Sequence, residues 1–184
     1  MLFRSYFYEC MTGFEYQAAG NMVWESDEQP DLMTKGLAIT RSIHDRYHGS
    51  KRNPFNEIEC SDHYARAMAS YGVYLAAAGF ENDGPKGHVG FKPRMTDKGN
   101  FKSAFTCAEG WGSYEQKGNK ITLDLHYGKL SLQTLSLRLS SKVTASTIDS
   151  SHGKASVSTD GKDTTLTFKE SLMLAAGDTL TMAV

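Results

Sequence analysis

The hydrophobic pattern changes its period part-way along the chain, and this change constrains the fold more than any other feature. Before Gly79, apolar residues recur at steps of three and four, which is the period of an amphipathic α-helix. After Lys120, apolar and polar residues alternate, most clearly in the run 121–127, which is the period of a β-strand. The sequence therefore predicts an α+β chain in which antiparallel helices are followed by a small antiparallel β-module.

Three long helices are expected before Gly79, over residues 12–24, 31–47 and 61–78. The first has capping-box spacing, so Glu15 is interpreted as a capping carboxylate rather than a catalyst. Asp31 and Ser61 are suitable caps for the other two helices. Gly79 is the expected C-terminal stop.

Each expected helix has an apolar stripe that predicts its buried face. The three stripes are Phe14, Ala18 and Met22; then Leu32, Gly36, Ile39, Ile43 and Tyr47; then Tyr64, Met68, Tyr71, Leu75 and Ala78. Helices joined by loops in this rhythm are typical of an antiparallel helical array.

Residues 81–118 are rich in glycine, proline and aromatic residues, which indicates turns and short extended pieces. His88, Trp111 and Tyr114 are candidates for contact with a sugar, or else Trp111 packs between the helical and β parts. The predicted domains are therefore a helical portion over 1–118 and a β appendage over 119–184.

In the appendage, turns are expected at Asp160-Gly161 and Gly177-Asp178. Its solvated face is rich in serine and threonine, and no group of residues in it suggests chemistry. The appendage is therefore interpreted as structural. Carbohydrate binding is an alternative, although few aromatic residues are present to stack on a sugar.

Composition excludes several classes of partner. The formal net charge is −1 and the basic residues are dispersed, so neither nucleic acid nor an anionic membrane is expected to bind. The longest apolar run, 71–80, is too short to span a bilayer, and the first residues do not have the pattern of a signal peptide. These features leave the localisation open.

Cysteine and histidine spacing also argues against a metal site. Cys10, Cys60 and Cys107 are sparse and odd in number, which fits reduced thiols in a reducing compartment and not a disulfide framework. His44 and His48 are four residues apart, as metal ligands on a helix often are. Basic residues at a helix C-terminus explain that spacing more simply. No cofactor or metal is expected.

Five charged or titratable residues are concentrated just before the third expected helix: Glu57, Glu59, Asp62, His63 and Arg66. Pro54 and Ser61 allow Glu57 to lie in a loop while Arg66 lies on the helix, so both can meet one ligand. Two alternatives stay open. In the first, the charges are caps and pairs at a helix end. In the second, Glu57 or Glu59 acts with Asp62 as the acid/base pair of a different hydrolase.

The same stretch carries a family resemblance. The run RNPFNEIECSDHYARAMASYGV resembles the C-terminal part of glycoside hydrolase family 116, which contains the non-lysosomal glucosylceramidases and related microbial β-glucosidases. The likeness continues in ECMTGFEYQAA, GLAITRSIHDRYHGSKRNPFNEIEC, GPKGHVGFKPR and FTCAEGWGSYEQ, from about Glu9 to Gln116. The order of several linked motifs makes it more specific than any single motif.

The resemblance implies an (α/α)6 barrel that this chain supplies only in part, the missing N-terminal part of the barrel being its partner. It implies hydrolysis of a β-glucoside or a glucosylated lipid with retention, by two carboxylates that lie upstream of the matched region. By position, Glu57 and Arg66 look like residues that hold glucose hydroxyls, and Glu59, Asp62 and His63 would orient them. The alternative is a non-catalytic sugar-binding or structural remnant of the family.

Overall fold

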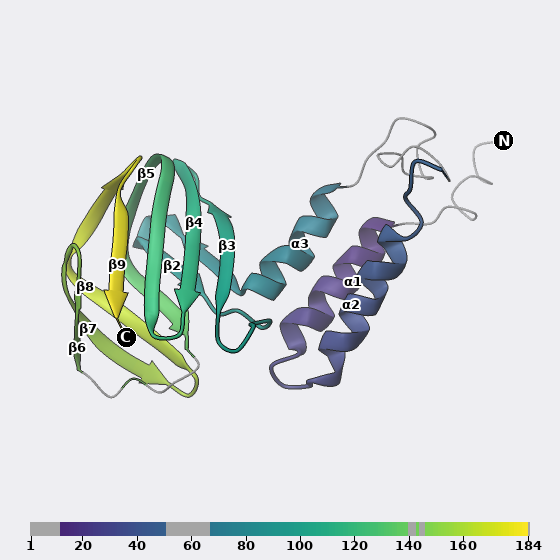
Figure 1. Ribbon diagram of the computed structural model, residues 1–184, viewed down its shortest axis with the longest axis horizontal. Helices are drawn as coiled ribbons and strands as arrows, with labels where there is room; N and C mark the ends of the chain where they lie inside the picture. Colours follow the sequence, from purple (N-terminus) through teal and green to yellow (C-terminus); the bar gives the residue numbers. More distant parts are fainter. Residues whose placement is uncertain (1–11, 51–66, 140–142, 144–145, 184) are drawn as a thin grey trace. The chain divides into compact units, whose positions relative to one another are not determined.

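The chain divides into two compact units, Met1–Ala77 and Ala78–Val184. The computed structural model describes residues 12–50, 67–139, 143 and 146–183 of the chain (Figure 1). The first unit is helical and the second is built of strands. Strands account for 49% and helices for 28% of the structure.

The predicted fold class, partial helical-barrel helices followed by a small β-module, is wrong. The described residues form three helices and a closed five-stranded β-barrel with extra strands, so the β unit dominates. The division between the units falls between Ala77 and Ala78, forty-one residues before the expected 118/119 boundary. The reason is that residues 80–117 form four short strands that pair within the β unit.

The helical unit contains helices α1 (Thr12–Glu25), α2 (Asp31–His44) and α3 (Ala67–Ala78). Helices α1 and α2 form an antiparallel hairpin (Figure 1). Helix α2 ends earlier than expected, and Tyr47 continues a turn by donating its N–H to the His44 carbonyl at 3.0 Å. Gly79 follows α3 with φ of 57°, as the sequence predicted for a helix stop.

The buried faces of α1 and α3 differ from the predicted stripes. Helix α1 buries Tyr16, Ala19 and Val23, whereas Phe14 is 64% exposed. On α3, Val73 and Ala76 are buried and Tyr71 is exposed. Small residues determine which face of each helix is buried, because they let neighbouring helices approach closely. At Gly36 of α2, an added Cβ would lie 2.8 Å from the carbonyl oxygen of Ala19.

Strand β5 organises the β unit because it pairs with four other strands: antiparallel with β4, β8 and β9, and parallel with β2. The strands are β1 (Phe80–Asp83), β2 (His88–Phe91), β3 (Phe101–Thr106), β4 (Gly110–Lys117), β5 (Lys120–Arg138), β6 (Thr147–Ser150), β7 (Gly153–Asp160), β8 (Asp163–Ala175) and β9 (Thr179–Ala183). A short 3-10 helix, η2 (Gly84–Lys86), joins β1 to β2. The ring of pairings runs β5–β8–β7–β6–β9 and returns to β5.

The two predicted turns of the β part have different roles. Asp160-Gly161 closes the hairpin between β7 and β8, as expected. Gly177-Asp178 also separates two strands, but β8 and β9 do not fold back on each other. They follow one another along β5, with Ala175 opposite Lys129 and Thr179 opposite Asp124.

The core of the β unit is aromatic at one end and aliphatic over the rest. Phe91 and Tyr114 stack with ring centroids 4.0 Å apart, and Phe105 meets Phe91 edge-on. Buried leucines from β5 and β8 fill the remainder, among them Leu123, Leu132, Leu135 and Leu166. Among the residues that the structure describes, no helix has the length and hydrophobicity needed to cross a membrane.

Candidate functional site

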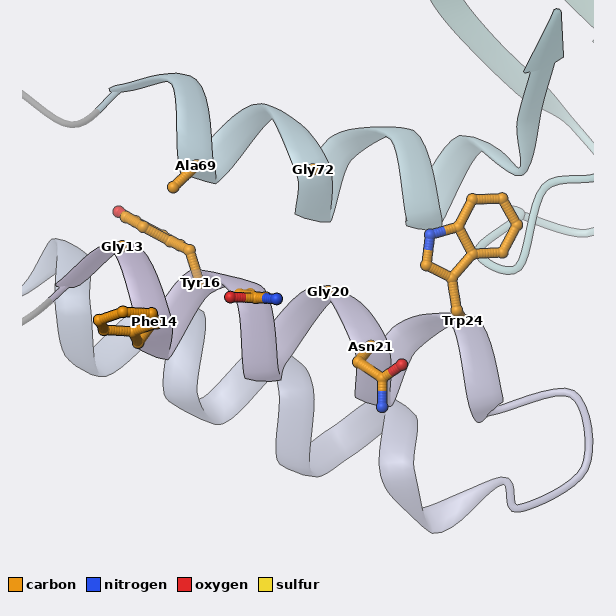
Figure 2. A pocket seen from close by; sticks show the side chains of 9 residues that line it. Gly13, Phe14, Tyr16, Gly20, Asn21, Trp24, Ala69 and Gly72 are labelled. Carbon is orange, nitrogen blue, oxygen red and sulfur yellow. The ribbon is translucent and has the colours of Figure 1, made fainter.

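A groove of about 540 Å³ lies between α1 and α3 in the helical unit (Figure 2). This volume is in the range of sites that hold small molecules. Its lining consists of glycines, one alanine, three aromatic residues and two amides: Gly13, Gly20, Gly72, Ala69, Phe14, Tyr16, Trp24, Gln17 and Asn21. Seven of the nine come from α1, so one face of this helix provides most of the groove.

Two glycines determine where the groove is narrow. A Cβ added to Gly20 would lie 3.6 Å from the backbone of Gly72, so α1 and α3 are close to each other at this point. Figure 2 shows Tyr16 and Trp24 projecting from α1 toward α3, on either side of Gly20. Aromatic rings therefore flank the narrow point.

The groove favours an uncharged ligand that forms hydrogen bonds. The described residues that line it include no charged side chain. Gln17 and Asn21 are exposed, and each amide offers both donors and an acceptor. Rings of Phe14 and Trp24 offer apolar faces beside them. This combination suits a neutral polyhydroxyl molecule better than an ionic one.

Ion pairs involve both helices of the α1–α2 hairpin. Glu15 of α1 forms an ion pair with Arg46, which follows α2, and Arg46 Nη1 lies 3.2 Å from Glu15 Oε1. This pair ties the start of α1 to the end of α2. At the start of α2, the hydrogen bond from Lys35 lowers the pKa of the Asp31 carboxyl group.

The five predicted site residues, Glu57, Glu59, Asp62, His63 and Arg66, lie outside the described residues. Their convergence on one ligand therefore stays a prediction. In the sequence, Arg66 directly precedes α3, the helix whose residues Ala69 and Gly72 line the groove.

The three candidates for sugar contact in the β unit have different surroundings. Tyr114 is fully buried and donates to Gln116 at 2.9 Å, so its ring is unavailable to a ligand. His88 is partly buried, with Nδ1 2.8 Å from the Thr134 hydroxyl. Trp111 is 48% exposed. Of the three, Trp111 is the ring that the structure leaves most open to solvent.

The histidines with metal-ligand spacing have other neighbours. His44 meets the ring of Tyr16 edge-on at 5.9 Å, and His48 Nδ1 lies 2.8 Å from the Ser50 hydroxyl. In the part of the chain that the structure describes, no group of three or more His, Cys, Asp or Glu side chains is placed to hold a metal ion. The described cysteine, Cys107, is a free thiol whose pKa is raised by burial.

Sequence reasoning missed the polar residues of the groove. Gln17 and Asn21 are four residues apart and lie between Phe14 and Trp24 on the same side of α1. Polar residues at helical spacing are usually assigned to the solvent face. The sequence feature that could have indicated the groove is the aromatic residue on each side of the two amides. Phe14 lies three residues before Gln17, and Trp24 lies three residues after Asn21.

The chain matches no protein-family model and no curated protein.

Proposed function

We propose that this chain is the sugar-binding C-terminal portion of a retaining β-glucoside hydrolase and has no hydrolytic activity by itself. The groove between α1 and α3 carries the proposal, because its described lining is uncharged and combines aromatic rings with amides. The motifs that resemble glycoside hydrolase family 116 point to the same ligand class. A non-catalytic sugar-binding or structural role is the alternative.

The chemistry of glucose matches this lining. A β-glucoside presents axial C–H groups on the faces of its ring and hydroxyl groups around the edge. Aromatic rings such as Trp24 pack against the faces, while Gln17 and Asn21 donate to and accept from the hydroxyls. A charged substrate would lose hydration in this groove without gaining an opposite charge among its described lining residues.

The charged residues before α3 complete the proposal. Glu57 would accept two hydroxyl hydrogens, and Arg66 would donate in its fixed fork geometry. Glu59, Asp62 and His63 would orient these two side chains. Retaining hydrolysis needs a nucleophile and an acid/base about 5 Å apart. The sequence motifs assign neither to this chain, so catalysis requires the upstream part of the enzyme.

Tryptophan fluorescence tests the groove. The chain has two tryptophans, so the Trp111→Phe variant leaves Trp24 as the single reporter in the groove. We expect methyl β-glucoside to change Trp24 emission saturably. We expect the same of 1-deoxynojirimycin, a glucose mimic that is uncharged when its ring amine is deprotonated. Adding Asn21→Ala should weaken binding about tenfold, which corresponds to the loss of one hydrogen bond to the ligand.

Ala18→Ser is the matched control, because Ala18 is exposed on α1 and is not part of the groove lining. It should leave the titration unchanged. Flat emission with both ligands would contradict sugar binding in the groove. So would an Asn21→Ala variant that binds as tightly as its parent.

Arg66→Ala tests the predicted guanidinium contact separately. In an enzyme assembled with its upstream part, it should cost on the order of 2–4 kcal/mol of transition-state stabilisation, as removal of a charged contact does. The measurement is kcat/KM on a nitrophenyl β-glucoside. The chain alone should release no nitrophenol, and release that follows the purified protein would refute the assignment of catalysis to the upstream part.

A further inference from the structure

Two large aromatic side chains lie exposed and opposite each other in the β unit. Trp111 of β4 is paired with Tyr127 of β5 in the antiparallel register. Their exposed fractions are 48% and 66%. Directly opposed side chains on one face of an antiparallel pair are close neighbours, so the two rings form one patch.

A β-bulge adds a third ring to this patch. The register of β4 and β5 shifts between Trp111 and Gly112, and the adjacent residues His126 and Tyr127 are both exposed instead of alternating. The His126 ring lies 5.2 Å from the Trp111 ring, and its Nε2 is 3.1 Å from the Ser113 hydroxyl. We call Trp111, His126 and Tyr127 the aromatic patch.

Glycines on both strands fix the backbone beneath the patch. A Cβ at Gly112 would overlap the carbonyl oxygen of Asp124, and one at Gly128 would overlap that of Glu109. Gly128 also has a φ of 75°, a backbone conformation that residues with a Cβ atom rarely adopt. The sequence Gly-Trp-Gly opposite Tyr-Gly therefore lets the backbones of β4 and β5 approach closely beneath the rings.

The surroundings of the patch indicate its ligand. Beside the rings, the same face carries the hydroxyls of Thr106 and Ser113 and the carboxylate of Asp124, which accepts from Thr179 at 2.6 Å. A stable protein interface needs about 800 Å² per partner with an apolar centre, which three rings with polar neighbours do not provide. Flat aromatic rings can stack on the faces of sugar rings, and the neighbouring hydroxyl groups can form hydrogen bonds with the sugar hydroxyls.

We infer that the aromatic patch binds a β-linked glucose chain, at a site in the β unit that is additional to the groove of the helical unit. The choice of β-linked glucose rests on the proposed function. A β-1,4-linked chain is flat and presents sugar-ring faces to a planar surface, whereas an α-1,4-linked chain coils. The patch would hold neighbouring units of a polymer and would take no part in cleavage.

The Trp24→Phe variant leaves Trp111 as the single tryptophan and tests this inference directly. We expect cellohexaose to change Trp111 emission saturably. Tyr127→Ser in this background should weaken binding about tenfold, because one stacking ring is removed. Met173→Ser, at a side chain of β8 that is 61% exposed, is the matched control and should leave the affinity unchanged.

Unchanged Trp111 emission would overturn the inference, and so would a Tyr127→Ser variant with its parent's affinity. Equal affinity for maltohexaose, which is α-linked, would overturn the assignment to β-linked chains. The two single-tryptophan variants keep the two sites distinct. If only Trp24 emission fails to respond to sugar, the proposal of sugar binding in the groove is contradicted. If only Trp111 emission fails to respond, the inference of sugar binding at the aromatic patch is contradicted.

Discussion

Tyr114 shows how one side chain can serve the core in two ways. Its ring is fully buried and stacks on Phe91, while its hydroxyl donates to Gln116 Oε1 at 2.9 Å. Gln116 is buried too, and its Nε2 donates to the Gly99 carbonyl at 3.2 Å. Burial raises the pKa of the Tyr114 phenol, so this hydroxyl stays a donor throughout the pH range in which proteins fold.

Tyr114→Phe is expected to destabilise the β unit. The stacked ring is kept, but the buried Gln116 oxygen loses its donor, which costs about 1–3 kcal/mol. The free energy of unfolding in urea measures the effect. Tyr127→Phe removes a hydroxyl from an exposed ring and serves as control. Equal stability of both variants would contradict the role of this hydrogen bond.

Cys107 is expected to react slowly with alkylating reagents at neutral pH. Burial raises the pKa of its thiol above the ordinary value of 9.0, so the reactive thiolate is scarcer than in an open cysteine. Peptide mass spectrometry after iodoacetamide treatment gives the rate at this residue. Labelling at the rate of free cysteine would show that the thiol is open.

At the scale of elements, the α1–α2 hairpin depends on a glycine in mid-helix. Alanine is normally preferred to glycine inside a helix by up to about 1 kcal/mol. At Gly36, however, an added Cβ would lie 2.8 Å from the Ala19 carbonyl oxygen and 3.0 Å from a Val23 methyl group. The close packing of the two helices therefore outweighs helix propensity at this position.

Gly36→Ala is expected to destabilise the hairpin by about 1–3 kcal/mol, as overpacking does. Hydrogen exchange should become faster in peptides from α1 and α2. Gly20→Ala is the matched control, because its nearest contact would be an ordinary 3.6 Å and its helix propensity improves. Slower exchange in Gly36→Ala would show that the helices can separate without cost.

The β3–β4 sheet edge is expected to lose stability in acid. The hydrogen bond from Lys117, and then the charges of Lys102, Lys117 and Lys120, lower the pKa of Glu115 below its ordinary value of 4.5. A lowered folded-state pKa stabilises the native state fully above the unfolded value, and this contribution disappears as the pH falls through the folded value. The melting temperature should therefore fall less between about pH 5 and pH 3 in Glu115→Gln than in the parent chain.

At the scale of the whole molecule, the two units have separate hydrophobic cores. One consists of residues from α1, α2 and α3, including Val23, Ile43 and Val73. The other consists of residues from the β unit, with Leu123 and Leu166 among its fully buried members. Because the two sets have no residue in common, damage to one core should stay local.

Leu123→Ala is expected to destabilise the β unit by about 2–5 kcal/mol, through lost burial and the cavity left behind. Hydrogen exchange should then rise in peptides of β4, β5 and β9, while peptides of α1 and α2 keep their protection. Combined with Gly36→Ala, the two effects should add. Faster exchange in α1 and α2 of the Leu123→Ala variant would contradict independent cores.

The candidate site was only partly predictable. Glu57 and Arg66 were selected from charge clustering and the family resemblance, and they lie outside the described residues. Trp111 was selected as a candidate for sugar contact, with packing between the helical and β parts as the alternative, but the bulge that brings His126 beside it has no local signal. The groove was missed because the sequence alone does not tell which side of α1 faces α3.

The local elements followed from the amino-acid sequence alone: the helices that begin at residues 12 and 31, the end of a helix at Gly79, and the alternating strand through 121–127. Periodicity and capping act between residues a few positions apart, so they can be read in one dimension. The fold class and the dominance of the β unit, in contrast, were set by long-range pairing. Those depend on pairings such as His88 with Thr134 and Asp124 with Thr179, which join residues remote in sequence and are selected by how side chains pack.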